Sequence, residues 1–453
     1  MVEESENKIF ILMEKYMMGP MGKMASWRFV RAIMSAGISA IPFIIVGSMF
    51  LVLNVLPDAL PFLEGFFDNT FFKISELYML AHKATMGILA LYFGIVVGYE
   101  YTRIIAEEEE MNLSAVNGAL LAMFAFFMTI PQVAIEKGEM SLIEKTGEDS
   151  SILNGWEISA DGVERLGASG IFAAIIMAIL AVQLYKLCVK YNLIIKLPEQ
   201  VPAGVSKSFS ALIPTFVLAF AVFIINGTLI GVGLDIFKAI EYPFGFVVNL
   251  TDTWLGVLVI VFLMNALWVV GIHGPNIING FALPVAIVNM QHNINGANIP
   301  YAGEFLNAFI HLGGSGATLG MCLFMLLWSR SQQLKILGKA SIVPSIFNIN
   351  EPIIFGLPVV YNPYLFVPFI LAPMVAASIG YWATKLNLMG TVIALMPFPI
   401  PIGAGAFIST GGSVGSVIIA IICAIAAFLV WLPFIKIYDT KLLKEEQGEE
   451  TAI

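Results

Sequence analysis

The residues of this chain that could do chemistry are isolated polar side chains within long apolar stretches. Glu351 is the strongest candidate, because it lies in FNINEPIIFGLPVVYNP (residues 347–363), a segment with three prolines and three asparagines. Pro352 biases the backbone of Glu351 towards an extended conformation, so we expect the carboxylate to lie on non-helical chain. Ionisable side chains are costly to bury among apolar segments, and at membrane depth they mark functional sites by default.

Two roles for Glu351 are compatible with its surroundings. A carboxylate accepts hydrogen bonds from sugar hydroxyls, and it can take a proton while a hydroxyl attacks an electrophile. The alternative is a structural carboxylate that binds backbone N–H groups and closes a hairpin. The residues alone leave both roles open.

His273 is the second candidate, in LWVVGIHGPNIING (residues 267–280). Glycines and a proline surround it and interrupt any helix there. Asn265 and Trp268 are three residues apart and would share one helix face, and Asn276 follows closely in the chain. An indole face stacks on the apolar C–H faces of a sugar while amides bind its hydroxyls, so we predict a sugar site around His273. The alternative is an interfacial tryptophan with a capping histidine.

The remaining histidines and the cysteines have weaker claims. We expect His82 to lie at the membrane interface, His292 to lie in a loop and His311 to be a packing residue. The three cysteines lack C-x-x-C spacing and lie in or beside apolar runs, which predicts small core residues at Cys188, Cys322 and Cys423. No histidine, cysteine and carboxylate set has metal-ligand spacing, so we predict neither a metal site nor a cofactor.

Composition places the chain in a membrane. Of its 453 residues 58% are hydrophobic and 12% are charged, and the mean hydropathy is +0.87. Soluble domains are about half apolar and about a quarter charged. No segment alternates like a barrel strand, so the spans are expected to be helical. The net charge of -9 without a basic patch argues against a nucleic-acid partner.

We predict an all-α polytopic membrane protein with continuous spans and two re-entrant hairpins. Continuous spans are expected at 32–56, 86–105, 113–130, 169–189, 209–234, 255–272, 305–328, 364–383 and 414–435. Glycine and proline interrupt three further apolar stretches, at 275–290, 352–361 and 390–408. Such broken backbone persists at membrane depth only inside protein or beside a watery cavity, and in transporters it marks the substrate site.

Basic residues predict the orientation, because loops rich in lysine and arginine stay in the cytoplasm. They cluster before residue 32, near 190, near 335 and near 440, which predicts cytoplasmic termini and an external segment at 131–167. A polar, proline-containing linker separates two lobes. The expected order is an interfacial amphipathic segment (1–25), an N-terminal lobe (26–195), the linker (196–214), a sugar-binding lobe (215–437) and a cytoplasmic tail (438–453).

Four motifs together resemble one protein family. They are MGPMGKMA at 18–25, GIHG at 271–274, GGSGATL at 313–319 and the segment of Glu351. From about residue 15 to 437 the chain is similar to the membrane (IIC) component of the bacterial phosphoenolpyruvate-dependent sugar phosphotransferase system, in the lactose/cellobiose/diacetylchitobiose group. The resemblance implies an inner-membrane homodimer with about ten transmembrane helices and two re-entrant hairpins per protomer. It also implies a dimer interface in the N-terminal lobe and a C-terminal lobe that moves to give alternating access.

The resemblance also implies roles for individual residues. In the family, the glutamate of NEP and the histidine of GIHG contact the sugar hydroxyl that becomes phosphorylated, and Glu351 and His273 match them. Asn348 and Asn350, in the same motif, are predicted to bind the disaccharide. A soluble IIB partner, recharged through a IIA protein, donates the phosphoryl group from its own cysteine. We expect IIB to be a separate protein, because only a short polar tail follows the last apolar segment.

The chain departs from the family pattern at PFPIP (residues 397–401), where many members carry a PWTTP-like stretch. Phe398 stands at the tryptophan position and offers a stacking face without an indole N–H, so we predict sugar contact there but leave the disaccharide open.

Without the resemblance, two other functions remain. One is an ion- or proton-coupled sugar symporter with Glu351 as the coupling group. The other is a facilitator or receptor that transfers no phosphate.

Overall fold

A computed structural model describes residues 23–136, 138–144, 151–159, 162–198, 200–202, 204, 209–357, 359, 362, 364–397 and 399–447. The chain divides into two compact units. The N-terminal unit comprises Ala25–Gly47 and Glu76–Val247, and the C-terminal unit comprises Met1–Met24, Ser48–Ser75 and Val248–Ile453. The interfacial segment expected at 1–25 lies almost wholly outside the described residues, and the expected lobe boundaries stay predictions.

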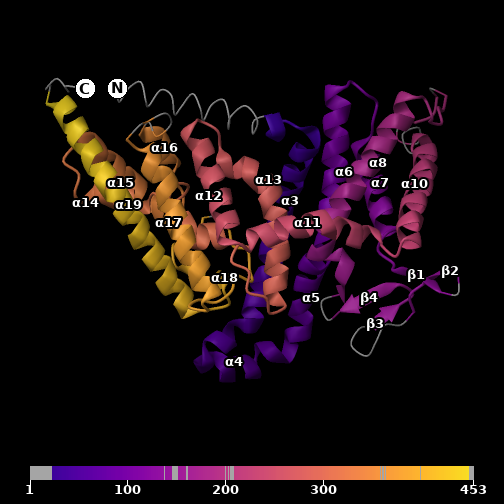
Figure 1. Cartoon of the computed structure of the whole chain (residues 1–453), viewed down its shortest axis with the longest axis horizontal. Coiled ribbons are helices and arrows are strands. Elements are labelled where there is room, and N and C mark those ends of the chain that lie inside the picture. The colour runs from indigo at the N-terminus through magenta and orange to yellow at the C-terminus, as the bar shows by residue number, and fades with distance from the viewer. Residues whose placement is uncertain are drawn as a thin grey trace. The chain divides into compact units, whose positions relative to one another are not determined.

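The N-terminal unit is mainly a helical bundle in which α6, α7 and α8 pack against one another and α10 packs on α8. Its α-helices (Figure 1) are the first part of α3 (Arg28–Ala59), α5 (Ser75–Thr85), α6 (Leu89–Glu108), α7 (Ala115–Phe127), α8 (Ile171–Lys190), α10 (Leu212–Gly231) and α11 (Ile236–Thr251). Its short 3₁₀ turns are η4 (Met86–Ile88), η5 (Glu164–Leu166) and η6 (Ala168–Gly170). Helices α6 and α7 approach closely because glycines stand at their crossing: a Cβ added at Gly98 would lie 2.5 Å from that of Ala122.

Two small antiparallel sheets lie between α7 and α8 in the chain. One pairs β1 with β2 and the other has the order β3-β4-β5. The strands are β1 (Val133–Glu136), β2 (Glu139–Leu142), β3 (Ser151–Leu153), β4 (Trp156–Ser159) and β5 (Gly162–Val163). The expectation of a purely helical chain is therefore wrong for residues 131–167. These strands are two to four residues long, so the alternation of polar and apolar residues in β2 and β4 is too short to predict a strand from the sequence.

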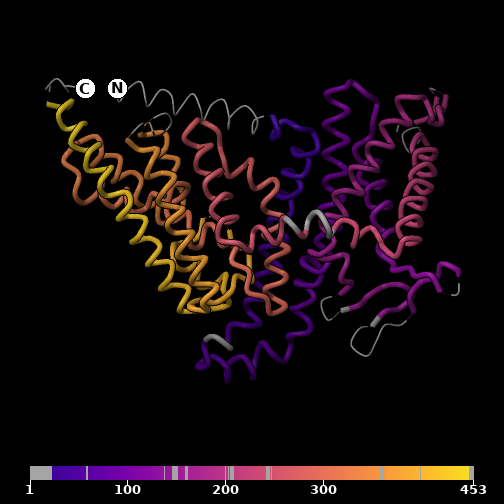
Figure 2. Tube along the Cα trace, in the orientation of Figure 1, coloured from indigo at the N-terminus to yellow at the C-terminus, as the bar shows by residue number. Residues whose placement is uncertain are grey.

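In the C-terminal unit α17 packs against α12 and α19, and α14 packs against α15 and α19. The α-helices are the end of α3, α4 (Glu64–Asn69), α12 (Trp254–Val269), α13 (Gly274–Ile294), α14 (Leu319–Leu327), α15 (Gln332–Ile346), α16 (Glu351–Gly356), α17 (Phe366–Lys385), α18 (Ala404–Ser409) and α19 (Val414–Glu446). Shorter turns are η2 (Pro61–Leu63), η3 (Phe71–Ile74) and a π-helix, η7 (Leu306–Ile310). The trace of α19 is the long yellow helix in Figure 2. Its Trp431 is fully buried and donates from Nε1 to the backbone oxygen of Gly316 at 2.9 Å.

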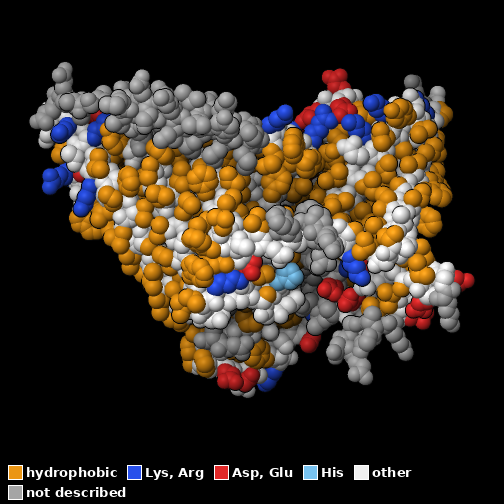
Figure 3. All heavy atoms as spheres, viewed as in Figure 1, with side chains coloured by type: hydrophobic (Ala, Val, Ile, Leu, Met, Phe, Trp, Pro, Cys, Tyr) orange, Lys and Arg blue, Asp and Glu red, His pale blue; other side chains and the backbone are white. Residues whose placement is uncertain are grey.

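Within the described residues, six helical stretches are long and apolar enough to cross a membrane. They are Arg28–Pro57, Phe71–Glu108, Ala168–Lys190, Leu212–Gly231, Phe366–Lys385 and Val414–Glu446, and two shorter apolar helices are Ala115–Phe127 and Trp254–Val269. Hydrophobic side chains cover much of the visible face of α19 and of α10 (Figure 3). The predicted membrane class is confirmed in this form, whereas the count of about ten spans and the two hairpins stay predictions.

Two expected elements differ in the structure. The stretch 305–328 is not one span, because residues 311–318, the glycine loop, separate η7 from α14. Gly313, Gly314 and Gly316 in this loop have φ values of 86°, 95° and 80°, which end a right-handed helix. Conversely, the stretch 275–290 is continuous within α13. Pro275 occupies the helix start, where a missing N–H costs little, and Pro284 is accommodated inside the helix.

Candidate functional site

Glu351 begins the short helix α16 and is exposed. Pro352 follows in the first turn, where backbone N–H groups have no partner within the helix, so its missing N–H leaves no bond unmade. The expectation that Glu351 lies on non-helical chain is therefore wrong. The first-turn position leaves the carboxylate accessible to a ligand, while α15 packs behind α16.

His273 stands at the N-cap of α13. Its Nδ1 accepts a hydrogen bond from the backbone N–H of Asn276 at 3.2 Å, so the capping role considered from the sequence is present. Because Nδ1 accepts, the proton of the neutral imidazole lies on Nε2, which is left as the donor. Both His273 and Asn276 are exposed. Capping thus fixes the tautomer that a ligand would meet.

Trp268 lies beside His273, with ring centroids 4.5 Å apart and ring planes at 49°. Trp268 is 9% exposed, and its Nε1 has no hydrogen-bond partner among the described residues. A buried N–H without a partner is costly, so this indole is suited to a ligand that brings an acceptor. Trp268 also belongs to the same buried apolar cluster as Ile353 and Ile354 of α16, the helix that Glu351 begins. The structure therefore brings together two stretches of the chain, one with Trp268 and His273 and the other with the helix that Glu351 begins.

Three predicted sugar-binding asparagines instead hold the glycine loop. Asn348 accepts from the backbone N–H of Gly313 at 2.9 Å, and Asn350 donates to the backbone oxygen of Ser315 at 2.6 Å. Asn265 accepts from the backbone N–H of Gly316 at 2.8 Å, and all three asparagines are buried. Their amides are engaged within the protein, so a direct sugar contact by these residues stays a prediction. Phe398 lies outside the described residues, and its predicted stacking role stays a prediction as well.

The Gly314→Ala variant is expected to destabilise the protein. An added Cβ would lie 2.4 Å from Cγ of Asn350, and the φ of 95° is strained for alanine. We expect the free energy of unfolding in detergent to fall by roughly 2–4 kcal/mol, from strain and overpacking together. Gly296→Ala is the matched control, because Gly296 has the same φ of 95° but no atom within 4 Å of the added Cβ. Equal losses in the two variants would contradict the role of the Asn350 contact.

Comparison with known proteins decides the family. The family model for the phosphotransferase system, EIIC, matches residues 34–373. The chain belongs to this family. The resemblance found in the motifs of Glu351 and His273 is thereby confirmed.

Relatives of this IIC component cover almost its whole length. The lichenan permease IIC component of Bacillus subtilis (strain 168) is 31% identical, over 98% of this chain and 96% of the relative. The cellobiose-specific EIIC component of Geobacillus stearothermophilus is also 31% identical, over 97% of this chain and 96% of the relative. The crystal structure of the transporter ChbC, the IIC component from the N,N'-diacetylchitobiose-specific phosphotransferase system, matches with a TM-score of 0.84 and 32% identity, covering 97% of this chain and 100% of that one.

Glu304 is a buried carboxylate of this IIC component that the motifs missed. Glu304 is 3% exposed and accepts from Nδ2 of Asn307 at 2.7 Å and from the backbone N–H of Met396 at 3.2 Å. A signal was available, because an acidic residue stands at the edge of the apolar stretch 305–328. His311, expected to be a packing residue, is buried with its Nε2 at 3.3 Å from Nδ2 of Asn265.

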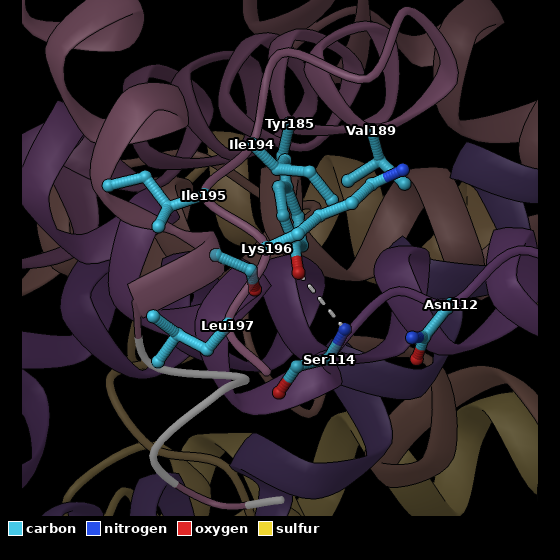
Figure 4. Close-up of a pocket in the computed structure, with 9 residues that line it drawn as sticks. Asn112, Ser114, Tyr185, Val189, Ile194, Ile195, Lys196 and Leu197 are labelled. Carbon is cyan, nitrogen blue, oxygen red and sulfur yellow. Dashed lines mark hydrogen bonds between the residues drawn. The ribbon is translucent and has the colours of Figure 1, made fainter. Parts of the chain in front are cut away.

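A cavity of about 290 Å³ lies in the N-terminal unit of this IIC component, at the start of α7 and the end of α8. Figure 4 shows its lining, in which the Tyr185 hydroxyl accepts from the backbone N–H of Ser114 at 3.2 Å. Lys196 and Asn112 also line it. None of the residues proposed for chemistry is among the lining residues.

Proposed function

We propose that this chain is the permease that imports a disaccharide of the cellobiose or diacetylchitobiose class, with phosphorylation by a separate phosphorylated IIB protein. The observation that carries the proposal is a histidine that donates from Nε2, packed beside a buried indole N–H without a partner among the described residues. The indole shares a buried cluster with the helix that the exposed carboxylate of Glu351 begins. Relatives named for cellobiose and diacetylchitobiose transport support the substrate class.

In the proposed reaction Glu351 acts as the base. The sugar hydroxyl gives its proton to the carboxylate while its oxygen attacks the phosphorus held on the IIB cysteine. The new P–O bond forms as the P–S bond breaks, and IIB leaves with a thiolate. Nε2–H of His273 donates to a phosphoryl oxygen and stabilises its charge. Phosphoryl transfer depends mainly on positioning and electrostatics, so this small polar cluster is sufficient.

Trp268 is proposed to receive the sugar by stacking, with its Nε1–H donating to a sugar oxygen. The phosphorylated product carries about two negative charges, which weakens its hold beside Glu351 and favours release into the cytoplasm.

We further propose a homodimer in the bacterial inner membrane, with cytoplasmic termini and alternating access. The basic residues near 190 and 335 support that orientation.

The test is transport by the purified protein in liposomes. With phosphorylated IIB on the inner side and a panel of labelled disaccharides outside, we expect sugar phosphate to accumulate inside for at least one β-linked disaccharide. Omitting IIB is the control and should leave no sugar phosphate. Unmodified sugar accumulating under a proton gradient without IIB would identify a symporter and overturn the proposal.

A further inference from the structure

A hydrogen-bond chain through Glu304 connects two segments of the C-terminal unit that are remote in sequence. One oxygen of Glu304 accepts from the backbone N–H of Met396 at 3.2 Å, and the other accepts from Nδ2 of Asn307 at 2.7 Å. The backbone oxygen of Asn307 accepts from Nδ2 of Asn348 at 3.2 Å, and Oδ1 of Asn348 accepts from the N–H of Gly313 at 2.9 Å. This series of hydrogen bonds therefore runs from residue 396 to the motif that carries Glu351.

Met396, at one end of this series of hydrogen bonds, belongs to no helix or strand. Residues 390–397 lie outside helices and strands, so their backbone groups need acceptors from elsewhere. The N–H of Leu395 donates to Oγ of Ser48 at 3.2 Å, and the next N–H, that of Met396, donates to Glu304. All four of these residues are buried, so each bond that is lost leaves a costly unpaired group. Two side chains thus fix the segment immediately before PFPIP.

The Asn348 end of the chain is equally constrained. Asn348 has a φ of 61°, in the left-handed region that asparagine tolerates, and it lies three residues before Glu351. Its amide is bonded at both ends, to Asn307 and to Gly313. A shift of Asn307 would therefore move the backbone from which α16 starts. The hydrogen bonds of Glu304 go to Asn307 and Met396 rather than to Glu351 or His273, yet through Asn307 they connect Met396 to the motif of Glu351.

We propose that Glu304 is a positioning residue of the sugar site, acting through two hydrogen bonds that set Met396 relative to the motif of Glu351. The inference rests on the proposed function only in taking the ligand to be a sugar. The acceptor geometry of Glu304 carries this role, and its negative charge is not required. A proton carrier differs in this respect, because its essential property is a carboxyl group that binds and releases a proton.

Two variants separate geometry from charge. Glu304→Gln keeps the side-chain length: its oxygen accepts from Met396 while its new amide N–H donates to Asn307, whose own amide turns end for end. Glu304→Asp keeps the charge but is one methylene shorter, so it cannot reach both donors. The positioning role predicts that Gln is tolerated and Asp is not, whereas a proton carrier predicts the reverse.

The measurement is sugar binding to purified full-length protein by calorimetry without IIB, using cellobiose, N,N'-diacetylchitobiose and lactose as probes. For the probe that binds wild type most tightly, we expect Kd to rise about tenfold or more in Glu304→Asp and to stay within about threefold in Glu304→Gln. Asn289→Ala is the matched control: Asn289 is also buried and makes two hydrogen bonds, to Thr251 and Tyr301, so its loss should lower the melting temperature and leave Kd unchanged.

The binding measurements distinguish failure of the positioning role from failure of the proposed function. Equal Kd values in Glu304→Asp and wild type, or a loss in Glu304→Gln as large as in Glu304→Asp, would overturn the positioning role. Wild type that binds sugar but forms no sugar phosphate with phosphorylated IIB would overturn the proposed function and leave the positioning role standing. Absence of binding to every probe would overturn both.

Discussion

Glu351→Gln is expected to form sugar phosphate at least about 10²-fold more slowly than wild type while still binding sugar, because the amide cannot take the hydroxyl proton. The side chain keeps its length and its exposed place at the start of α16, so the helix should be unaffected. Single-turnover transfer from phosphorylated IIB to cellobiose measures the rate, and calorimetry measures binding.

Glu445→Gln is the matched control for this variant. Glu445 is an exposed glutamate of the same unit, on α19, with its Oε1 3.9 Å from Nζ of Lys441. Removing this weak surface pair should change neither rate nor affinity. Near-normal sugar-phosphate formation in Glu351→Gln would remove Glu351 from the chemistry and support the structural role that the sequence left open.

His273→Asn should slow phosphoryl transfer by about 10²-fold with little loss of stability. Asparagine is among the best N-cap residues, so its side-chain oxygen should replace Nδ1 as the acceptor for the N–H of Asn276. What it removes is the Nε2 donor and the ring beside Trp268. The variant therefore separates the two roles of His273, which His273→Ala would confound.

The readouts for His273→Asn are the melting temperature in detergent and the single-turnover rate. His292→Asn is the histidine control, because His292 is exposed in the last turn of α13, away from the cap. A normal transfer rate in His273→Asn would show that capping is the only role of His273. A strong fall in melting temperature would show instead that asparagine does not restore the cap.

The sequence by itself determined the membrane class, the mainly helical character and the two groups with the strongest claim to chemistry. These conclusions rest on local signals: apolar length, and charged or aromatic side chains where an apolar run is broken by glycine or proline. The pairing of Glu351 with His273 came from the resemblance carried by four motifs, to the family that residues 34–373 match.

Only the tertiary structure decided how the polar side chains are used. Asn348 and Asn350 are predicted sugar ligands, and the structure adds that their amides bind the glycine loop, 35 residues earlier in the chain. Glu304 finds one of its donors at Met396, 92 residues away. Sequence spacing predicts partners within a helix or turn, but a buried polar group is satisfied by whichever donor or acceptor the packing brings within about 3 Å, and that choice is made by the fold.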